Sequence, residues 1–193
     1  MSTALSNTGL ETLAPLAGSS LTKQALLVIG GSLFLAVLSQ AAVGAPVPMT
    51  LQTLGVLLIG LTFGFRLASA TLALYLIEGA IGLPVFAEFK SGIGVFIGGT
   101  GGYLVGFLAA AALIGYLANR GFTRSWVGTI IALLAGEALI FGLGAGWLTY
   151  LYGFEKAMEW GVTPFILGDA IKVALAALIG KGVLKGAERF AQL

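Results

Sequence analysis

The sequence predicts an all-α integral membrane protein with six transmembrane helices in a single bundle. Hydrophobic residues make up 58% of its 193 residues and charged residues 9%, about a third of the charged share of a typical soluble domain. The hydrophobic residues form long continuous runs, whereas the strands of a membrane β-barrel alternate. Because one crossing takes about 20 apolar residues, the chain has room for roughly six or seven crossings.

The apolar runs set the boundaries of the six predicted spans. The spans lie at 25–43, 49–64, 67–83, 100–120, 125–153 and 163–183. The second span is short, and the fifth is long enough to tilt or to extend beyond the bilayer. Residues 1–22, rich in Ser, Thr, Leu and Gly, are predicted to form a mobile lead-in. The membrane-embedded domain is therefore predicted to cover residues 23–193.

The basic residues predict a multi-pass protein of the cell membrane with both termini cytoplasmic. In this orientation the outer loops carry Lys90 and Lys156. The cytoplasmic side carries Lys23, Arg66, Arg120, Arg124, Lys181, Lys185 and Arg189. Such an excess follows the positive-inside rule. A cleaved signal peptide ending at VGA, 43–45, is a weaker alternative, because the lead-in contains Glu11 and little positive charge.

Ionisable side chains gather in the outer half of the predicted bundle. Asp169 and Lys172 of the last span lie about 9 and 13 Å below the outer face, at a helical rise of about 1.5 Å per residue. Glu137 in the fifth span lies at about 12 Å and Glu78 in the third at about 14 Å. Each charge at membrane depth costs about 2.5–3.5 kcal/mol. The shared depth therefore predicts a polar pocket that opens to the outside, with Gln52 near its mouth.

Two interpretations of these charges stay open. Lys172 can simply neutralise Glu137 at matching depth, or Asp169, which lies three residues away on the same helix face. Three carboxyl groups facing one lysine nevertheless leave two acids without a cationic partner. A pocket that offers hydrogen-bond donors, acceptors and one ammonium suits a ligand with amide-like groups and a carboxylate.

A glycine-rich segment leads into the fourth predicted span. The sequence SGIGVFIGGTGGYLVGF, residues 91–107, lacks the GK[ST] ending of a phosphate loop. Gly98, Gly99 and Gly101 come before the helix proper, where a backbone without side chains can approach a ligand closely. The start of the fourth span is therefore a candidate part of the pocket.

Several function classes find no support in the sequence. It contains no cysteine and no histidine, which excludes thiol catalysis and the usual zinc sites. Its net charge of +2 is too small and too scattered for nucleic-acid binding. The sequence offers no catalytic constellation, cofactor motif or ATP site, so the chain is not predicted to be an enzyme. Active transport would need energy from elsewhere.

Four further sequence blocks are informative together: VPMTLQTLGVLLIG (47–60), GLPVFA (82–87), GGTGGYLVGF (98–107) and PFILGDAIK (164–172). In combination they resemble the BioY family, the biotin-specific substrate-binding (S) components of energy-coupling factor (ECF) transporters. They follow the family's order and span most of the chain after Lys23. The resemblance implies that the chain captures biotin from outside, under the loops that follow the first, third and fifth spans.

The resemblance also implies which groups hold biotin. Asp169 and Lys172 match the family's GDxxK motif and are expected to bind the ureido ring through a carboxylate and an ammonium. The residues expected to close the pocket or to pack on the thiophane ring are Gln52, Gly98, Gly99, Gly101, Tyr103 and Phe86. Backbone amides of the glycine segment are one candidate for the biotin carboxylate. The resemblance assigns no role to Glu78 or Glu137.

The partners implied by the resemblance are a transmembrane coupling protein and two ABC-type ATPases, which supply energy in the family. There the S component is thought to tip in the bilayer and present the vitamin inward. Ser32 and Ala36 form a small-xxx-small face that resembles the surface used for docking. A second hypothesis, a small proton-coupled transporter for a cationic solute, follows from the surplus of intramembrane acids. An intramembrane enzyme is a third hypothesis, with no motif to support it.

Overall fold

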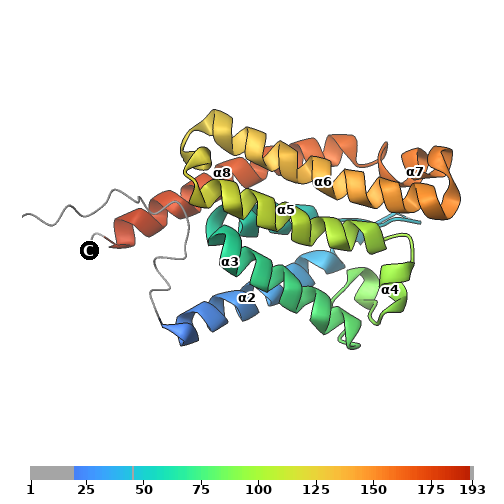
Figure 1. The fold of residues 1–193 in the computed structure, drawn as a ribbon, viewed down its shortest axis with the longest axis horizontal. Helices are drawn as coiled ribbons and strands as arrows, with labels where there is room; N and C mark the ends of the chain where they lie inside the picture. Colours follow the sequence, from blue (N-terminus) through green and yellow to red (C-terminus); the bar gives the residue numbers. More distant parts are fainter. Residues whose placement is uncertain (1–19, 45, 192–193) are drawn as a thin grey trace, which may run out of the picture.

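The computed structural model describes residues 20–44 and 46–191, and its long elements are α-helices (Figure 1). The predicted lead-in, residues 1–22, lies outside the described residues except for its last three positions. The long helices are α2 (Leu21–Gln40), α3 (Gln52–Ala80), α5 (Gly101–Asn119), α6 (Trp126–Tyr152) and α8 (Ile166–Ala191). The short elements are β1 (Ala42–Val43), β2 (Met49–Thr50), η1 (Ala87–Phe89), α4 (Gly94–Ile97), η2 (Phe122–Arg124) and α7 (Phe154–Gly161).

Local sequence sets where these helices begin and end. The hydroxyl of Ser125 accepts a hydrogen bond of 2.9 Å from the backbone N–H of Gly128 and so caps α6. Shortly after α5, Gly121 adopts a left-handed φ of 78°, which favours glycine. Helix α8 begins three residues later than predicted, because the backbone N–H of Phe165 closes a turn on the carbonyl of Val162 at 3.0 Å.

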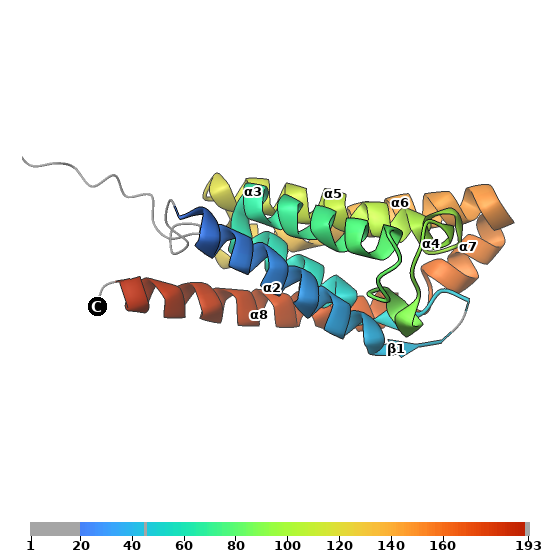
Figure 2. The same ribbon diagram turned by 90° about the horizontal axis from the view of Figure 1, so that it is seen from below.

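Helix α3 reverses direction at Gly64, so that it forms two helical arms, 52–63 and 65–80 (Figure 2). In a straight helix, residues 23 positions apart would be separated by about 34 Å. The side-chain amide of Gln52 instead donates to the hydroxyl of Tyr75, 23 positions away, at 2.6 Å. Gly64 has φ 74° and ψ 172°, a conformation nearly confined to glycine. The reversal falls at the boundary between the predicted spans 49–64 and 67–83.

Close backbone approach holds the centre of the bundle together. Helix α5 packs against both α3 and α6, while α2 and α8 pack against α3. A Cβ at Gly60 of α3 would lie 3.0 Å from Ile114 of α5, and one at Gly106 would lie 2.9 Å from the backbone of Ile140. Glycine at these positions lets the helices approach within this distance.

The two ends of the bundle differ in what they carry. Helix α2 begins and α8 ends at one end, whereas the β1–β2 pair, α4 and α7 gather at the other (Figures 1 and 2). In β1–β2, Ala42 pairs with Thr50 and Val43 with Met49 in antiparallel register. The segments that connect the long helices at this second end surround the cavity described below.

The helices confirm an all-α, multi-pass membrane protein. Among the described residues, α2, α3, α5 and α6 are long and apolar enough to cross a membrane. Helices α7 and α8, bent by 51° with respect to each other, give a fifth candidate if they form one broken span. This count takes α3 as one span, although its chain reverses at Gly64. Six spans and cytoplasmic termini stay predictions.

Replacing Gly64 with alanine is expected to lower the stability of the bundle by about 1–3 kcal/mol, because a side chain is strained in this backbone conformation. The measurement is thermal unfolding of the purified protein in detergent. Gly142→Ala is the matched control: it lies within α6, and no described atom outside its immediate helix surroundings comes within 4 Å of its added Cβ. Equal unfolding midpoints for the two variants would contradict the strain argument.

Candidate functional site

A cavity lies between the first arm of α3, helices α5, α6 and α8, and the connections that precede α3 and α5. Its polar lining comes from side chains that can donate or accept hydrogen bonds: Thr50, Gln52, Thr53, Lys90, Thr100, Asp169 and Lys172. The rest of the lining is largely aromatic or aliphatic, with Phe86, Tyr103, Phe107, Ile140, Phe141 and Phe165 among its members. The cavity therefore combines a small polar group of residues with an apolar wall.

Asp169 and Lys172 form a buried ion pair in the first turns of α8. The Lys172 ammonium lies 2.6 Å from Asp169 Oδ1 and donates to the hydroxyl of Thr53 at 2.8 Å. The same hydroxyl lies 3.2 Å from Asp169 Oδ1, to which it donates. Asp169 and Lys172 are 3% and 8% exposed. An acidic residue near a helix N-terminus is favoured by the helix dipole, so α8 stabilises the carboxylate.

The ion pair leaves one carboxylate oxygen of Asp169 without a hydrogen-bond donor among the described residues. Asp169 Oδ2 is buried and has no hydrogen-bond partner within the described ranges 20–44 and 46–191. An unpaired buried acceptor lowers stability, because it has lost water without gaining a donor. The charges thus do neutralise each other, as one sequence interpretation allowed, but beside a cavity that they also line.

Gln52 begins the first arm of α3, and its amide is held at both ends. Its Oε1 accepts from the hydroxyl of Thr50 at 3.0 Å, and its Nε2 donates to the hydroxyl of Tyr75 at 2.6 Å. The Tyr75 hydroxyl in turn donates to the carbonyl of Val85 at 2.8 Å. These bonds connect both arms of α3 to the connection that follows the second arm.

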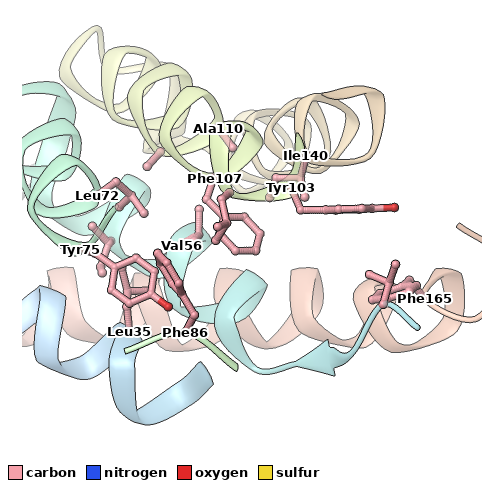
Figure 3. Packing of buried hydrophobic residues seen from close by; sticks show 14 of the residues in the cluster. Leu35, Val56, Leu72, Tyr75, Phe86, Tyr103, Phe107, Ala110, Ile140 and Phe165 are labelled. Atoms are coloured by element: carbon pink, nitrogen blue, oxygen red, sulfur yellow. The ribbon is translucent and has the colours of Figure 1, made fainter. Parts of the chain in front are cut away.

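Aromatic rings form much of the apolar wall, and Phe86, Tyr103, Phe107 and Phe165 among them belong to the buried core cluster drawn in Figure 3. The Tyr103 hydroxyl donates to the carbonyl of Gly161 at 2.7 Å, and its ring stacks on Phe165 with centroids 6.3 Å apart. Phe86 is 2% exposed, and its ring centroid lies 5.4 Å from that of Tyr75. Phe86 occupies the space beside Gly79, where a Cβ would collide with its ring. Tyr103 and Phe86 therefore have fixed positions on the cavity wall.

The three predicted glycines do not join the other predicted residues. Several described residues of the glycine-rich segment 91–107 line the cavity, among them Val95, Thr100 and Tyr103, but Gly98, Gly99 and Gly101 do not. The carbonyl of Gly98 accepts from the indole N–H of Trp147 at 2.9 Å. Gly101 borders a separate apolar groove between α5 and α6. The structure thus gathers Gln52, Phe86, Tyr103, Asp169 and Lys172 around the cavity, and the three glycines are outside its lining.

Four polar lining residues, Thr50, Thr53, Lys90 and Thr100, were not among the predicted site residues. Thr53 hydrogen-bonds to both members of the ion pair. The sequence feature that could have identified it is its position directly after Gln52 in the block 47–60. Lys90 follows η1, and its side chain is 55% exposed and forms a 2.6 Å ion pair with Glu88. The sequence feature that could have identified Lys90 is that it is one of two basic residues in the predicted outer loops. Lys90 therefore marks the solvent-exposed side of the cavity, and Asp169 its buried side.

The other two intramembrane acids do not line the cavity. Glu137 is 6% exposed, and neither of its carboxylate oxygens has a partner in the described part of the chain. It lies one helical turn before Ile140 and Phe141, which do line the cavity. Glu78 accepts a hydrogen bond from the hydroxyl of Ser32, 46 positions earlier. Glu78 therefore connects α2 to the second arm of α3, away from the ion pair.

The predicted docking face needs correction. Ser32 is fully buried because its hydroxyl points inward to Glu78. Ala36 is partly buried and packs against the hydrophobic core. The exposed face of α2 instead carries larger apolar side chains, with Leu33 58% and Val37 70% exposed. Spacing of small residues identified a packing face of α2, but that face is directed into this bundle.

The family model of the BioY family matches residues 6–189. The chain belongs to the BioY family. This match begins before Lys23, so the family likeness extends into the segment that the four sequence blocks left uncovered.

Individual BioY relatives agree with this assignment. The biotin transporter BioY of Thermotoga maritima is 42% identical over 135 residues, which cover 69% of this chain and 79% of the relative. The biotin transporter BioY of Rhizobium etli is 35% identical over 150 residues, with 73% and 80% covered. These relatives are named as transporters, which confirms the prediction of a transport protein rather than an enzyme.

A solved structure shares the fold. The S-component for biotin from an ECF-type ABC transporter superposes with a TM-score of 0.75 at 27% sequence identity. The likeness covers 89% of this chain and 92% of that one. Together with the named relatives, it favours the S-component hypothesis over a proton-coupled transporter.

Gly79→Ala is expected to destabilise the protein by about 1–3 kcal/mol, because the added methyl group would displace the buried ring of Phe86. Thermal unfolding of the purified protein measures this effect. Gly146→Ala on α6 is the control, because the surroundings of its Cβ are open among the described atoms. A Gly79 variant as stable as the control would show that Phe86 is free to move.

Proposed function

We propose that this chain is the substrate-binding component that captures biotin from the external side for uptake by an ATP-driven ECF transporter. The observation that carries the proposal is the buried Asp169–Lys172 pair on the cavity wall, with a carboxylate oxygen left to accept a ligand donor. The chain's membership of the BioY family supports biotin as that ligand, because relatives of 42% and 35% identity are named biotin transporters.

The ureido ring of biotin matches the hydrogen-bonding capacity that the ion pair leaves. This ring offers two N–H donors and one carbonyl acceptor. Asp169 Oδ2 is an acceptor for an N–H. Lys172 carries three donors, of which two go to Asp169 and Thr53, so the third suits the ureido carbonyl. Hydrogen bonds to charged groups at a buried site are strong, which favours this end of the cavity for the ring.

The remaining parts of biotin fit the rest of the cavity. Tyr103 and Phe86 supply the apolar surface for the thiophane ring, and Phe107 extends it. Lys90 supplies the cation for the carboxylate of the valeryl chain, at the exposed side of the cavity. This assignment replaces the backbone amides of the glycine segment, because the three glycines lie outside the lining. Biotin is then bound with its ureido ring inward and its carboxylate toward solvent.

The helices and the charges together support the proposed membrane arrangement. The two arms of α3 act as separate spans, so that α2, the two arms, α5, α6 and α8 make six. Both termini lie on the cytoplasmic side of the cell membrane, and the cavity end of the bundle faces outward. The reversal at Gly64 and the basic residues at the opposite end support this orientation.

The partners are the membrane lipids, a transmembrane coupling protein and two ABC-type ATPases. The support is the likeness to an S-component from an ECF-type ABC transporter. The exposed apolar face of α2, with Leu33, Phe34 and Val37, is the proposed docking surface in place of Ser32. The chain itself binds the vitamin and takes no cofactor.

Asp169→Asn and Lys172→Met are each expected to weaken biotin binding about 10- to 100-fold, because a hydrogen bond to a charged group contributes about 1.5–3 kcal/mol. Isothermal titration of the purified, ligand-free protein with biotin measures the affinity. Glu155→Gln on α7 removes a charge from an exposed position and serves as the control. If Asp169→Asn and Lys172→Met both remain folded and bind biotin as tightly as the unmodified chain, the assignment of the ureido ring to these residues is wrong.

Thr53→Val is expected to weaken biotin binding about tenfold, because it removes the hydroxyl that holds Asp169 and Lys172 together. Thr53→Ser keeps the hydroxyl and is expected to retain most of the affinity. The same titration compares the two variants. A valine variant that binds biotin as tightly as the serine variant would show that the hydroxyl of Thr53 is not needed.

A further inference from the structure

The connection that carries Lys90 and Phe86 to the cavity, residues 86–90, is a short closed loop. The backbone N–H of Phe86 donates to the carbonyl of Lys90 at 3.1 Å, and that of Lys90 donates to Ala87 at 3.2 Å. Between them, Glu88 and Phe89 have φ values of 59° and 57°. Residues other than glycine rarely adopt this conformation, and they keep it where the surrounding structure holds them. The 86–90 loop therefore depends on contacts from outside itself.

The side chain of Gln40, the last residue of α2, makes contacts of this kind. Its Nε2 donates to the carbonyl of Phe86 at 3.1 Å, and its Oε1 accepts from the backbone N–H of Phe89 at 3.0 Å. One amide thus bonds the carbonyl of Phe86, which precedes the two strained residues, and the N–H of Phe89, the second of them. This requires a donor and an acceptor on the same side chain, which glutamine has and ionised glutamate lacks.

The surroundings fix the orientation of this amide. Gln40 Nε2 also lies 2.7 Å from the hydroxyl of Ser39 and 3.2 Å from the carbonyl of Ala36, so its two N–H donors are shared among three acceptors. The Ser39 hydroxyl lies 2.7 Å from the carbonyl of Val85, to which it donates. Ser39 therefore holds the entry to the 86–90 loop, whereas Gln40 spans the loop itself.

We propose that Gln40 is a positioning residue that fixes the 86–90 loop and thereby holds Lys90 where it binds the ligand carboxylate. This inference rests on the proposed function, in which Lys90 receives the carboxylate of biotin. Gln40 is not among the described residues that line the cavity, so its effect on binding passes through the loop. The effect should accordingly be larger for a ligand with a free carboxylate than for one without.

The test compares biotin with biotin methyl ester, which has the same rings but no carboxylate charge. Gln40→Ala is expected to weaken biotin binding about tenfold, the loss of two neutral hydrogen bonds, and to weaken binding of the ester clearly less. In a Lys90→Ala background, Gln40→Ala should no longer change the ratio of the two affinities. Leu26→Ala, an exposed position on the same helix, is the control and should leave both affinities unchanged.

A second variant separates positioning from folding. Gln40→Met keeps the volume of the side chain but makes neither hydrogen bond, so it should also weaken biotin binding more than ester binding. It takes the place of the alanine variant if that variant fails to fold. Equal weakening of biotin and ester, or a selective weakening of biotin that persists in the Lys90→Ala background, would overturn the inference while leaving biotin binding established. Failure of the unmodified chain to bind biotin would overturn the proposed function itself, and the inference with it.

Discussion

The ammonium of Lys172 constrains the whole site, because a buried cation must be paired and hydrogen-bonded to be tolerated. Its two partners come from different parts of the chain: Asp169 lies one turn earlier on α8, and Thr53 lies on the first arm of α3. The polar contact therefore ties α8 to α3 within an apolar bundle. The separation of these two helices, and so the width of the buried end of the cavity, depends on that contact.

The reversal of α3 lets one continuous segment contribute to the cavity from two sides. Its first arm begins with Gln52 and Thr53 on the cavity wall, and its second arm brings Tyr75 back to the same end. Gly64 lies at the opposite end of the bundle and makes this return possible with almost no connecting residues. The strained backbone is thus remote from the site that it helps to form.

Sequence predicted those parts of the molecule that depend on local periodicity. Hydropathy located the long helices, and the spacing of Asp169 and Lys172 placed both on one helix face. It did not reveal that Ser32 faces inward, because its partner Glu78 is 46 positions away. Small residues mark a close packing face equally well toward the bundle and toward another protein.

Lys90 was missed for a similar reason: its place on the cavity depends on a loop whose contacts come from α2. The short helices α4 and α7 were missed because tertiary packing, and not length or hydropathy, defines them.

The ion pair between Lys90 and Glu88 gives the exposed side of the cavity a built-in counterion. In the proposed binding mode, the ligand carboxylate competes with Glu88 for Lys90 and does not meet an unpaired charge. The electrostatic energy gained on binding is then the difference between the Lys90–ligand ion pair and the Lys90–Glu88 ion pair. When the ligand leaves, the Lys90–Glu88 pair forms again. A carrier must release its cargo as well as capture it, and a resident anion beside the lysine favours the return step.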